Sequence, residues 1–185
     1  MTNDNPAPIV RTDVNLVFGN KYITVFDDPV VMPGGREGTY LRIVESNGRP
    51  GVAMLPLAGN LVGIVRTFRY PTGAWEWAIP RGFAHSDDPT ASARNELTEE
   101  LGGEPDDLVE LGVTEPNSGL LTSRVHVFLA VYNEPTVAPV DTEEVQELRW
   151  LPVSEFLQSI VHGKITDGFT LAAVSLALLK GRIAL

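Results

Sequence analysis

The stretch IPRGFAHSDDPTASARNELTEELGG, residues 79–103, carries the strongest structural signals in the chain. Asp88 is a good N-cap candidate, and Pro89 suits the first helical position, where a missing backbone N–H costs nothing. The pair Gly102-Gly103 is typical of a helix end. The stretch therefore predicts a helix from about Pro89 to Leu101, preceded by a glycine-containing loop.

Carboxylates gather on one side of this predicted helix. Glu96 and Glu100 lie one turn apart on the same face, and Glu99 is adjacent. Such bunched charges usually form a solvated face, and they destabilise an isolated helix by a few tenths of a kcal/mol per pair. A divalent cation reverses that sign, because Mg²⁺ prefers oxygen ligands and is usually held by carboxylates together with substrate phosphates. The triplet alone favours the solvated face, and the complete string favours a metal site.

Segments with β-strand character lie on both sides of this helix. Strands are expected at residues 14–18, 22–26, 30–31, 40–44, 52–57, 61–68, 75–80, 108–114, 125–132 and 145–151, with further helices at 153–162 and 170–179. The tripeptide Asp27-Asp28-Pro29 is expected to form a turn, and Asp167 to cap the last helix. Strands and helices mix without a regular βαβ alternation. This pattern predicts an α+β fold, an α/β/α sandwich around a mixed sheet.

The turn-forming segment Asn47-Gly48-Arg49-Pro50 is a candidate domain boundary. Residues 1–48 are expected to form an N-terminal antiparallel β annex, of which residues 1–10 are polar, rich in proline and expected to be disordered. Residues 49–185 are expected to form the main domain.

Composition narrows the classes of partner. The chain has 185 residues, a formal net charge of −10 and no cysteine. A protein this acidic gains no counterion-release energy from nucleic acid, and no apolar stretch approaches the ~20 residues that span a bilayer. The absence of cysteine excludes disulfides and thiolate metal sites and fits a cytoplasmic location. We therefore expect neither nucleic acid nor a membrane as a partner.

The stretch around the helix resembles the Nudix box. The second half of that motif matches when it is aligned on Glu96-Leu97-x-Glu99-Glu100-x-Gly102. The first half departs from it, because Gly82 and Asp87 are one residue too close and Asp stands where the family has Glu. Asn95 occupies the position of an arginine that helps to orient a catalytic glutamate. Arg94 cannot replace it, since it points about 100° away.

The surrounding sequence is similar to that of ADP-ribose pyrophosphatases within the Nudix family. The similarity covers residues 66–71, 75–82, 116–119, 125–130 and 163–171. Two positions depart from that subfamily: Ala78 stands where Glu is common, and Ser123 where an acidic residue is common. An N-terminal β annex takes part in dimerisation in that subfamily, so the resemblance implies a homodimer.

The resemblance implies the following roles for individual residues. Glu96, Glu99 and Glu100 would bind the metal, Mg²⁺ or alternatively Mn²⁺, together with the backbone carbonyl of Arg81. Glu99 and Glu100 would thereby also be catalytic. A general base would come from the loop after the long strand, where the choice between Glu143 and Glu144 stays open; a solvated acidic turn is the alternative.

Substrate contacts are expected from residues just before the box. Arg66 and Arg69 suit bidentate recognition of phosphate, and Trp75 and Trp77 suit stacking on a base. Ordinary surface charge and packing at the edge of the core are the alternatives for these two pairs.

Two functions follow from the resemblance. The first is metal-dependent hydrolysis of the pyrophosphate bond in a nucleoside diphosphate-sugar such as ADP-ribose, a small-molecule nucleotide substrate, to a nucleoside monophosphate and a sugar phosphate. The second is a catalytically weak module of the same fold that binds a nucleotide sugar as a sensor. The four departures from the motifs favour the sensor, whereas the retained carboxylate cluster favours the enzyme.

Overall fold

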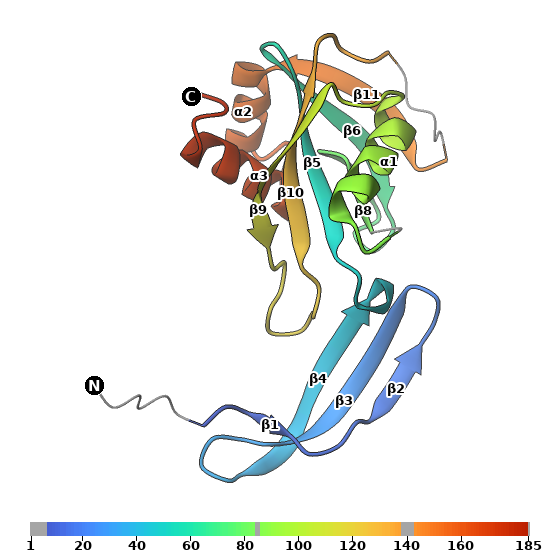
Figure 1. Cartoon of the computed structure of the whole chain (residues 1–185), viewed down its shortest axis with the longest axis vertical. Helices are drawn as coiled ribbons and strands as arrows, with labels where there is room; N and C mark the ends of the chain where they lie inside the picture. Colours follow the sequence, from blue (N-terminus) through green and yellow to red (C-terminus); the bar gives the residue numbers. More distant parts are fainter. Residues whose placement is uncertain (1–6, 84–85, 138–142, 185) are drawn as a thin grey trace, which may run out of the picture. The chain divides into compact units, whose positions relative to one another are not determined.

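The computed structural model describes residues 7–83, 86–137 and 143–184. The chain forms two compact units. One contains the residues up to Arg49 together with Asn117–Ser123, and we call it the annex. The other contains Pro50–Pro116 and the residues from Arg124 onward, and we call it the main unit (Figure 1).

The main unit is built on a mixed sheet. Its central strands follow the order β11-β6-β5-β10-β9, with β7 paired to β6 and β8 paired to β5. The pair β5 and β10 is parallel, and the other pairs are antiparallel. The strands span Gly51–Ala58 (β5), Leu61–Arg69 (β6), Ala74–Ala78 (β7), Arg81–Phe83 (β8), Asp107–Thr114 (β9), Val125–Tyr132 (β10) and Val145–Pro152 (β11).

Helices cover both faces of this sheet. Helix α1 (Pro89–Leu101) packs on one face, and α2 (Val153–Val161) and α3 (Gly168–Leu179) pack on the other (Figure 1). The predicted α/β/α sandwich with a mixed sheet is therefore confirmed. Within the described part of the chain, every helix is too short or too polar to cross a bilayer.

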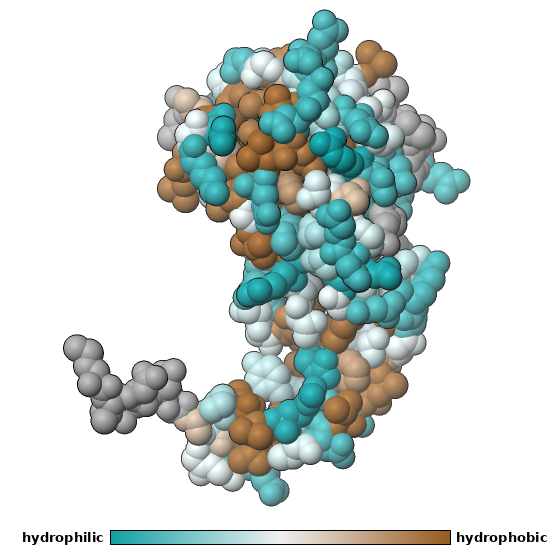
Figure 2. Space-filling view, in the orientation of Figure 1, coloured by the Kyte–Doolittle hydropathy of each residue, from teal (hydrophilic) through white to brown (hydrophobic). Residues whose placement is uncertain are grey.

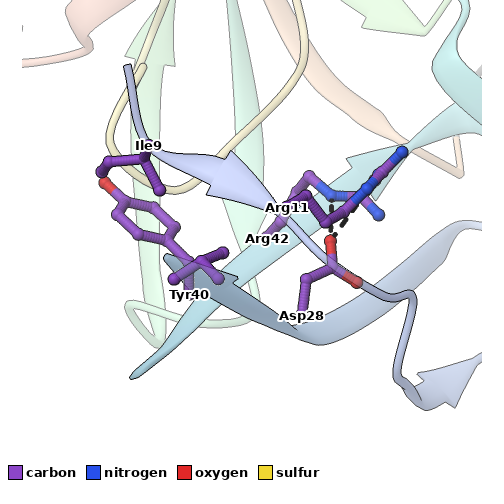
Figure 3. Close-up of a pocket in the computed structure, with 6 residues that line it drawn as sticks. Ile9, Arg11, Asp28, Tyr40 and Arg42 are labelled. Carbon is purple, nitrogen blue, oxygen red and sulfur yellow. Dashed lines mark hydrogen bonds and ion pairs between the residues drawn. The ribbon is translucent and has the colours of Figure 1, made fainter. Parts of the chain in front are cut away.

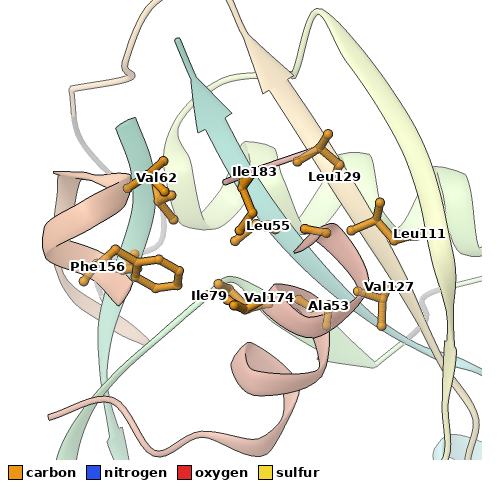
Figure 4. Close-up of a cluster of buried hydrophobic side chains, with 14 of the residues drawn as sticks. Ala53, Leu55, Val62, Ile79, Leu111, Val127, Leu129, Phe156, Val174 and Ile183 are labelled. Atoms are coloured by element: carbon orange, nitrogen blue, oxygen red, sulfur yellow. The ribbon is translucent and has the colours of Figure 1, made fainter. Parts of the chain in front are cut away.

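Two apolar clusters fill the space between the layers. Strand residues of alternating parity point to opposite faces, so neighbouring residues of β5 belong to different clusters. Ala53 and Leu55 join the cluster under α2 and α3, which Figure 4 shows around Phe156 and Val174. Val52 and Met54 join the cluster under α1. This alternation fixes which side of the sheet each later site residue faces.

Helix α1 begins and ends where the sequence predicted. The Asp88 side chain accepts a hydrogen bond from the Thr90 backbone N–H at 2.8 Å, and Gly102 ends the helix in the left-handed region with φ of 76°. Asp167 likewise caps α3 through Thr170. Both caps were predicted from residue type alone.

The annex is a four-stranded antiparallel sheet around β3. Its strands are β1 (Val10–Arg11), β2 (Leu16–Gly19), β3 (Ile23–Val31) and β4 (Glu37–Glu45), with a short 3-10 turn, η1, at Ser46–Gly48. Residues 117–123 add to it: the Ile43 backbone N–H donates to the Leu120 carbonyl at 2.9 Å, and the Ile43 carbonyl accepts from the Thr122 N–H at 3.0 Å. The sequence did not indicate this addition.

Two predictions for the annex were wrong. Asp27-Asp28-Pro29 forms no turn, because β3 runs through it. Arg42 donates a hydrogen bond to the buried Asp28 carboxylate at 2.9 Å. The Pro29 carbonyl accepts from the backbone N–H of Thr12, which lies between β1 and β2 and outside the paired residues of both. The N–H that Pro29 lacks is therefore not needed for a hydrogen bond of the sheet. The expected disorder of residues 1–10 also fails at its end, because Val10 begins β1; residues 1–6 lie outside the described range.

Candidate metal and substrate site

The candidate site lies where helix α1 packs against the segment that precedes it in the chain. Glu96 and Glu100 are on the inner side of α1, with 8% and 7% of their surface exposed. The Arg81 backbone N–H donates a hydrogen bond to the Glu100 carboxylate. Two carboxylates are thus held out of bulk water, whereas glutamate is almost never buried without a partner. The prediction of a solvated face does not describe this pair.

The environment of Glu100 disfavours its charged form. Burial first, and the neighbouring Glu96 carboxylate second, raise the pKa of Glu100 to about 8, and Glu144 acts in the same direction. The Arg69 guanidinium and the Arg81 backbone N–H oppose this rise. A carboxyl with such a pKa holds a proton near neutral pH, unless a cation takes the proton's place.

Gly82 makes room for the Glu96 carboxylate. A Cβ atom placed on Gly82 would overlap the Glu96 carboxylate group. Gly82 pairs with Val52 of β5, whose side chain faces α1, so its missing side chain is on the α1 side of the sheet. The glycine at the start of the motif therefore has a steric role, because it allows a carboxylate to lie against the backbone of β8.

The other acidic residues predicted for the site, Glu99, Glu143 and Glu144, are exposed and are not grouped with the Glu96–Glu100 pair. Glu99 is exposed on the outer side of α1. Over residues 7–83, 86–137 and 143–184, no three acidic or histidine side chains are grouped closely enough to hold a metal by themselves. Glu143 and Glu144 are both exposed before β11, but only Glu144 is among the groups that shift the pKa of Glu100. The structure thus places Glu144 near the buried pair.

The predicted substrate-binding residues divide between the two faces of the sheet. Arg69 is close enough to Glu100, Glu76 and Arg81 to feel their charges, and burial and then the charge of Arg81 lower the pKa of Arg69. Arg66 is three residues away on β6 and therefore faces the other side. There its guanidinium carbon is 5.3 Å from the centre of the Trp75 ring.

Trp75 and Trp77 lie on the same face of β7, two residues apart. Trp75 is 47% exposed and meets Phe68 edge to face at 5.4 Å. Trp77 packs partly against the core under α2 and α3, and the guanidinium carbon of Arg149 lies 4.6 Å from the centre of its ring. Trp75 is therefore the tryptophan with a ring available to a ligand.

Residues of α3 that the sequence did not single out for the site reach it from the opposite side. An Arg81 Nη atom is 3.0 Å from the Asp167 carboxylate, and its guanidinium carbon is 4.8 Å from the centre of the Phe169 ring. A hollow of about 210 Å³ opens beside these residues, lined by Thr114, Glu115, Pro116, Asp167, Gly168 and Phe169. Asp167 had been recognised as a cap only, because a contact over such a chain distance leaves no local signal.

The residues that depart from the motifs have ordinary positions. Ala78 is fully buried at the end of β7, and Asn95 is exposed on α1. The Ser123 hydroxyl donates to the Glu45 carboxylate at 2.6 Å within the annex. Asp87 precedes the cap of α1 and is engaged in an interaction of its own.

The mixed-sheet sandwich is a Nudix fold, and its buried glutamate pair lies beside a glycine-containing segment. A family model described as the NUDIX domain matches residues 48–169. The chain therefore belongs to the Nudix family and is a hydrolase.

Several characterised proteins are similar to this chain. The CMP-5'-(N-acetyl-N-hydroxy-3-aminopropyl)phosphonate hydrolase of Streptomyces rubellomurinus is 27% identical over 172 residues, which cover 90% of this chain and 81% of that protein. The GDP-mannose pyrophosphatase of Klebsiella pneumoniae is 34% identical over 91 residues, 47% of this chain and 46% of that protein. A crystal structure of an ADP compounds hydrolase superposes with a TM-score of 0.81 at 18% identity, over 97% of this chain and 98% of that one.

Nudix hydrolases use divalent metal ions, and the residues of this site fit such an ion. Glu96 and Glu100 supply hard oxygen donors, and their mutual repulsion in a buried place is relieved by a cation between or beside them. Two protein carboxylates are enough for such an ion, because water and substrate phosphates can complete its shell.

Proposed function

We propose that this chain hydrolyses the pyrophosphate bond of a nucleoside diphosphate-sugar, with ADP-ribose as the first compound to test. The observation that carries the proposal is the buried Glu96–Glu100 pair beside Arg69. The products would be a nucleoside monophosphate and a sugar phosphate. Of the similar proteins, one is named for GDP-mannose and one for a CMP-linked phosphonate, so both compounds belong in the same test.

The residues of the site divide the work by their charge. Glu96 and Glu100, with the backbone carbonyl of Arg81, would hold a divalent ion, Mg²⁺ or Mn²⁺. Glu99, which the resemblance also implies as a ligand, is exposed on the outer side of α1 and is not assigned to this ion. That ion, when bound, screens the diphosphate and lowers the pKa of a bound water. Arg69, which shares its surroundings with Glu100, would pair with a phosphate oxygen of the substrate.

Arg66 and Trp75 would bind another part of the substrate than Arg69 does. Trp77 would support them from below, because its ring is already covered by the Arg149 guanidinium. Arg66 already donates to the Gln146 side chain at 2.9 Å and lies over Trp75. These residues lie on the face of the sheet opposite to Arg69, where Trp75 is 47% exposed, and we call them the platform. We assign this platform to the base or the sugar, because a ring stacks on a tryptophan whereas a diphosphate does not.

We assign the role of general base to Glu144 rather than Glu143. Glu144 is near enough to raise the pKa of Glu100, and it is exposed, so that its carboxylate can reach water. It would take a proton from the attacking water, while the P–O–P bond breaks and the leaving phosphate departs with the bonding electrons.

A turnover experiment on Glu100 tests this proposal. The protein and its Glu100→Gln variant are incubated with ADP-ribose, GDP-mannose and a CMP-linked phosphonate, with Mg²⁺, with Mn²⁺ or with a chelator. We expect metal-dependent release of a nucleoside monophosphate, reduced in the variant by several orders of magnitude, because Gln cannot supply the anionic ligand. The control is Glu134→Gln, which removes an exposed charge. Near-normal turnover by the Glu100 variant would reject the assignment.

Binding a nucleotide sugar without turnover is the second candidate function. The observation in its favour is Asn95, which is exposed on α1 where the resemblance implies an arginine that orients a catalytic glutamate. Calorimetry with ADP-ribose in the presence of a chelator separates the two functions. A sensor binds the ligand without metal and releases no product, whereas the hydrolase needs the metal for turnover.

We also propose that the annex joins two copies of the chain. Its single sheet has no second layer of its own: of its described residues only Asp28 and Val30 are buried. Figure 2 shows apolar side chains on the annex face in view. The annex also has a hollow of about 340 Å³, lined by Ile9, Arg11, Asp28, Val30, Tyr40 and Arg42 (Figure 3). The proposed location is the cytoplasm.

A further inference from the structure

The segment from Ile79 to Gly82 is held from both faces of the sheet. On the α1 side, Glu100 accepts a hydrogen bond from the Arg81 backbone and Glu96 lies against Gly82. On the other side, the Ile79 N–H donates to the Thr170 hydroxyl of α3 at 3.1 Å. The proposed metal ligands therefore rest on a segment whose other side belongs to α3.

The contacts from α3 form one connected network. The Asp167 carboxylate accepts from the backbone N–H and the hydroxyl of Thr170, both at 2.9 Å, through one oxygen. Its other oxygen pairs with the Arg81 guanidinium at 3.0 Å. Thr170 is fully buried, and the Asp167 side chain is only 6% exposed. Buried and mutually satisfied hydrogen bonds of this kind hold a backbone more firmly than exposed ones.

Capping of α3 does not account for this whole arrangement. An N-cap needs only one acceptor for the Thr170 N–H, and Asp88 caps α1 through a single such bond. The hydroxyl of Thr170 and the second oxygen of Asp167 are directed instead at the Ile79–Arg81 backbone segment and the Arg81 side chain. Pro80 between them is also tied, because its carbonyl accepts from Met54 of β5 at 3.0 Å.

We propose that Asp167 and Thr170 are positioning residues for the Glu96–Glu100 pair, acting from α3 through residues 79–82. The inference rests on the proposed function, since it concerns the same carboxylates. Asp167 and Thr170 contact neither the carboxylates of Glu96 and Glu100 nor, in this assignment, the substrate. Their effect is to fix the backbone against which both glutamates lie, and with it the Arg81 carbonyl that would help to hold the metal.

The Thr170→Val variant tests the proposal, because it keeps the shape of the side chain and removes the acceptor for Ile79. We expect Mn²⁺ affinity in titration calorimetry to fall by about 10- to 100-fold, as is usual when an outer partner of a metal ligand is lost. The amides of Ile79 and Arg81 should exchange hydrogen faster. Thr170→Ser, which keeps the hydroxyl, should restore both properties.

The matched control is Val153→Ala, which removes buried apolar volume from α2 without touching the network. It should lower the melting temperature and leave Mn²⁺ affinity unchanged. Equal effects of Thr170→Val and Val153→Ala on affinity, or no recovery in Thr170→Ser, would overturn the proposal. Should Thr170→Val not fold, Asp167→Asn keeps a good cap while losing the Arg81 pair; unchanged Mn²⁺ affinity there would also overturn it.

These outcomes are separable from the fate of the proposed function. Metal affinity and amide exchange need no turnover, so they test the positioning role even in a chain that only binds its nucleotide. A wild-type protein that binds Mn²⁺ at this site but hydrolyses none of the compounds would reject the reaction and retain the positioning role.

Discussion

At the scale of single residues, Glu100 shows how burial and charge are balanced in this site. It lies among two carboxylates that repel it, one guanidinium that attracts it and one backbone N–H that donates to it. The repulsion and the burial dominate, so its proton is retained to about pH 8 in the metal-free protein. A divalent ion must displace that proton, and metal binding near neutral pH should therefore release protons.

The raised pKa of Glu100 makes a prediction about stability. The carboxyl has a pKa of about 8 in the folded protein and an ordinary value of 4.5, so the unfolded chain gives up the proton more readily. Its contribution to stability is complete below pH 4.5 and is lost as the pH rises through 8. In the presence of a chelator, the melting temperature of the wild-type protein should fall as the pH rises over this range. The melting temperature of the Glu100→Gln variant should fall less.

Thermal unfolding followed by circular dichroism measures this difference, with Glu134→Gln as the control for the loss of one exposed charge. An identical decline in the Glu100 variant and in the wild-type protein would show that Glu100 ionises normally. Added Mg²⁺ should remove most of the wild-type decline, because a bound ion stabilises the charged form.

At the scale of elements, the packing of α1 on β8 depends on the absence of one side chain. Gly82→Ala should displace Glu96, since the new methyl group would occupy the position of the carboxylate. We expect Mn²⁺ affinity to fall by about 10- to 100-fold and turnover to fall with it. Titration calorimetry and product release measure the two effects.

Gly19→Ala in the annex is the matched control, because its new Cβ would meet only the Thr24 methyl group at 4.0 Å. It should leave both metal affinity and turnover unchanged. Wild-type affinity in Gly82→Ala would mean that Glu96 can lie elsewhere without loss, and the steric role of Gly82 would then be wrong.

Local signals account for what the sequence could predict at this scale. The limits of α1 follow from Asp88, Pro89 and Gly102, and the largely apolar runs of β5 and β10 were recognised as strands. The network from Asp167 to Arg81 could not be predicted, because it depends on the return of the chain to the sheet 86 positions later (167 − 81). The straight course of β3 was missed because Asp-Pro is usually turn chemistry. The groups that make a buried aspartate favourable there, Arg42, Arg11 and the Asn15 backbone N–H, lie elsewhere in the chain.

At the scale of the whole molecule, the annex is expected to govern assembly. Leu16 and Phe18 of β2 are 60% and 51% exposed, because no second layer covers the annex sheet. The wild-type protein should be a dimer in light scattering, and Phe18→Glu should be monomeric, because a charge on this surface opposes its burial against a second copy.

Val161→Glu provides the comparison, since Val161 is 74% exposed at the end of α2 in the main unit. It should leave the dimer intact. A monomeric wild-type protein, or a dimer that survives Phe18→Glu and is lost in Val161→Glu, would refute an interface in the annex.

The chain visits the annex twice, first with its N-terminal strands and again with Asn117–Ser123 between β9 and β10. A shortened protein that starts after Arg49 would therefore keep a hairpin loop whose hydrogen-bonding strand, β4, had been deleted. Leu120 and Leu121 would lose their backbone pairing with Ile43. Expression of the main unit without the annex should accordingly require redesign of that loop as well as removal of residues 1–49.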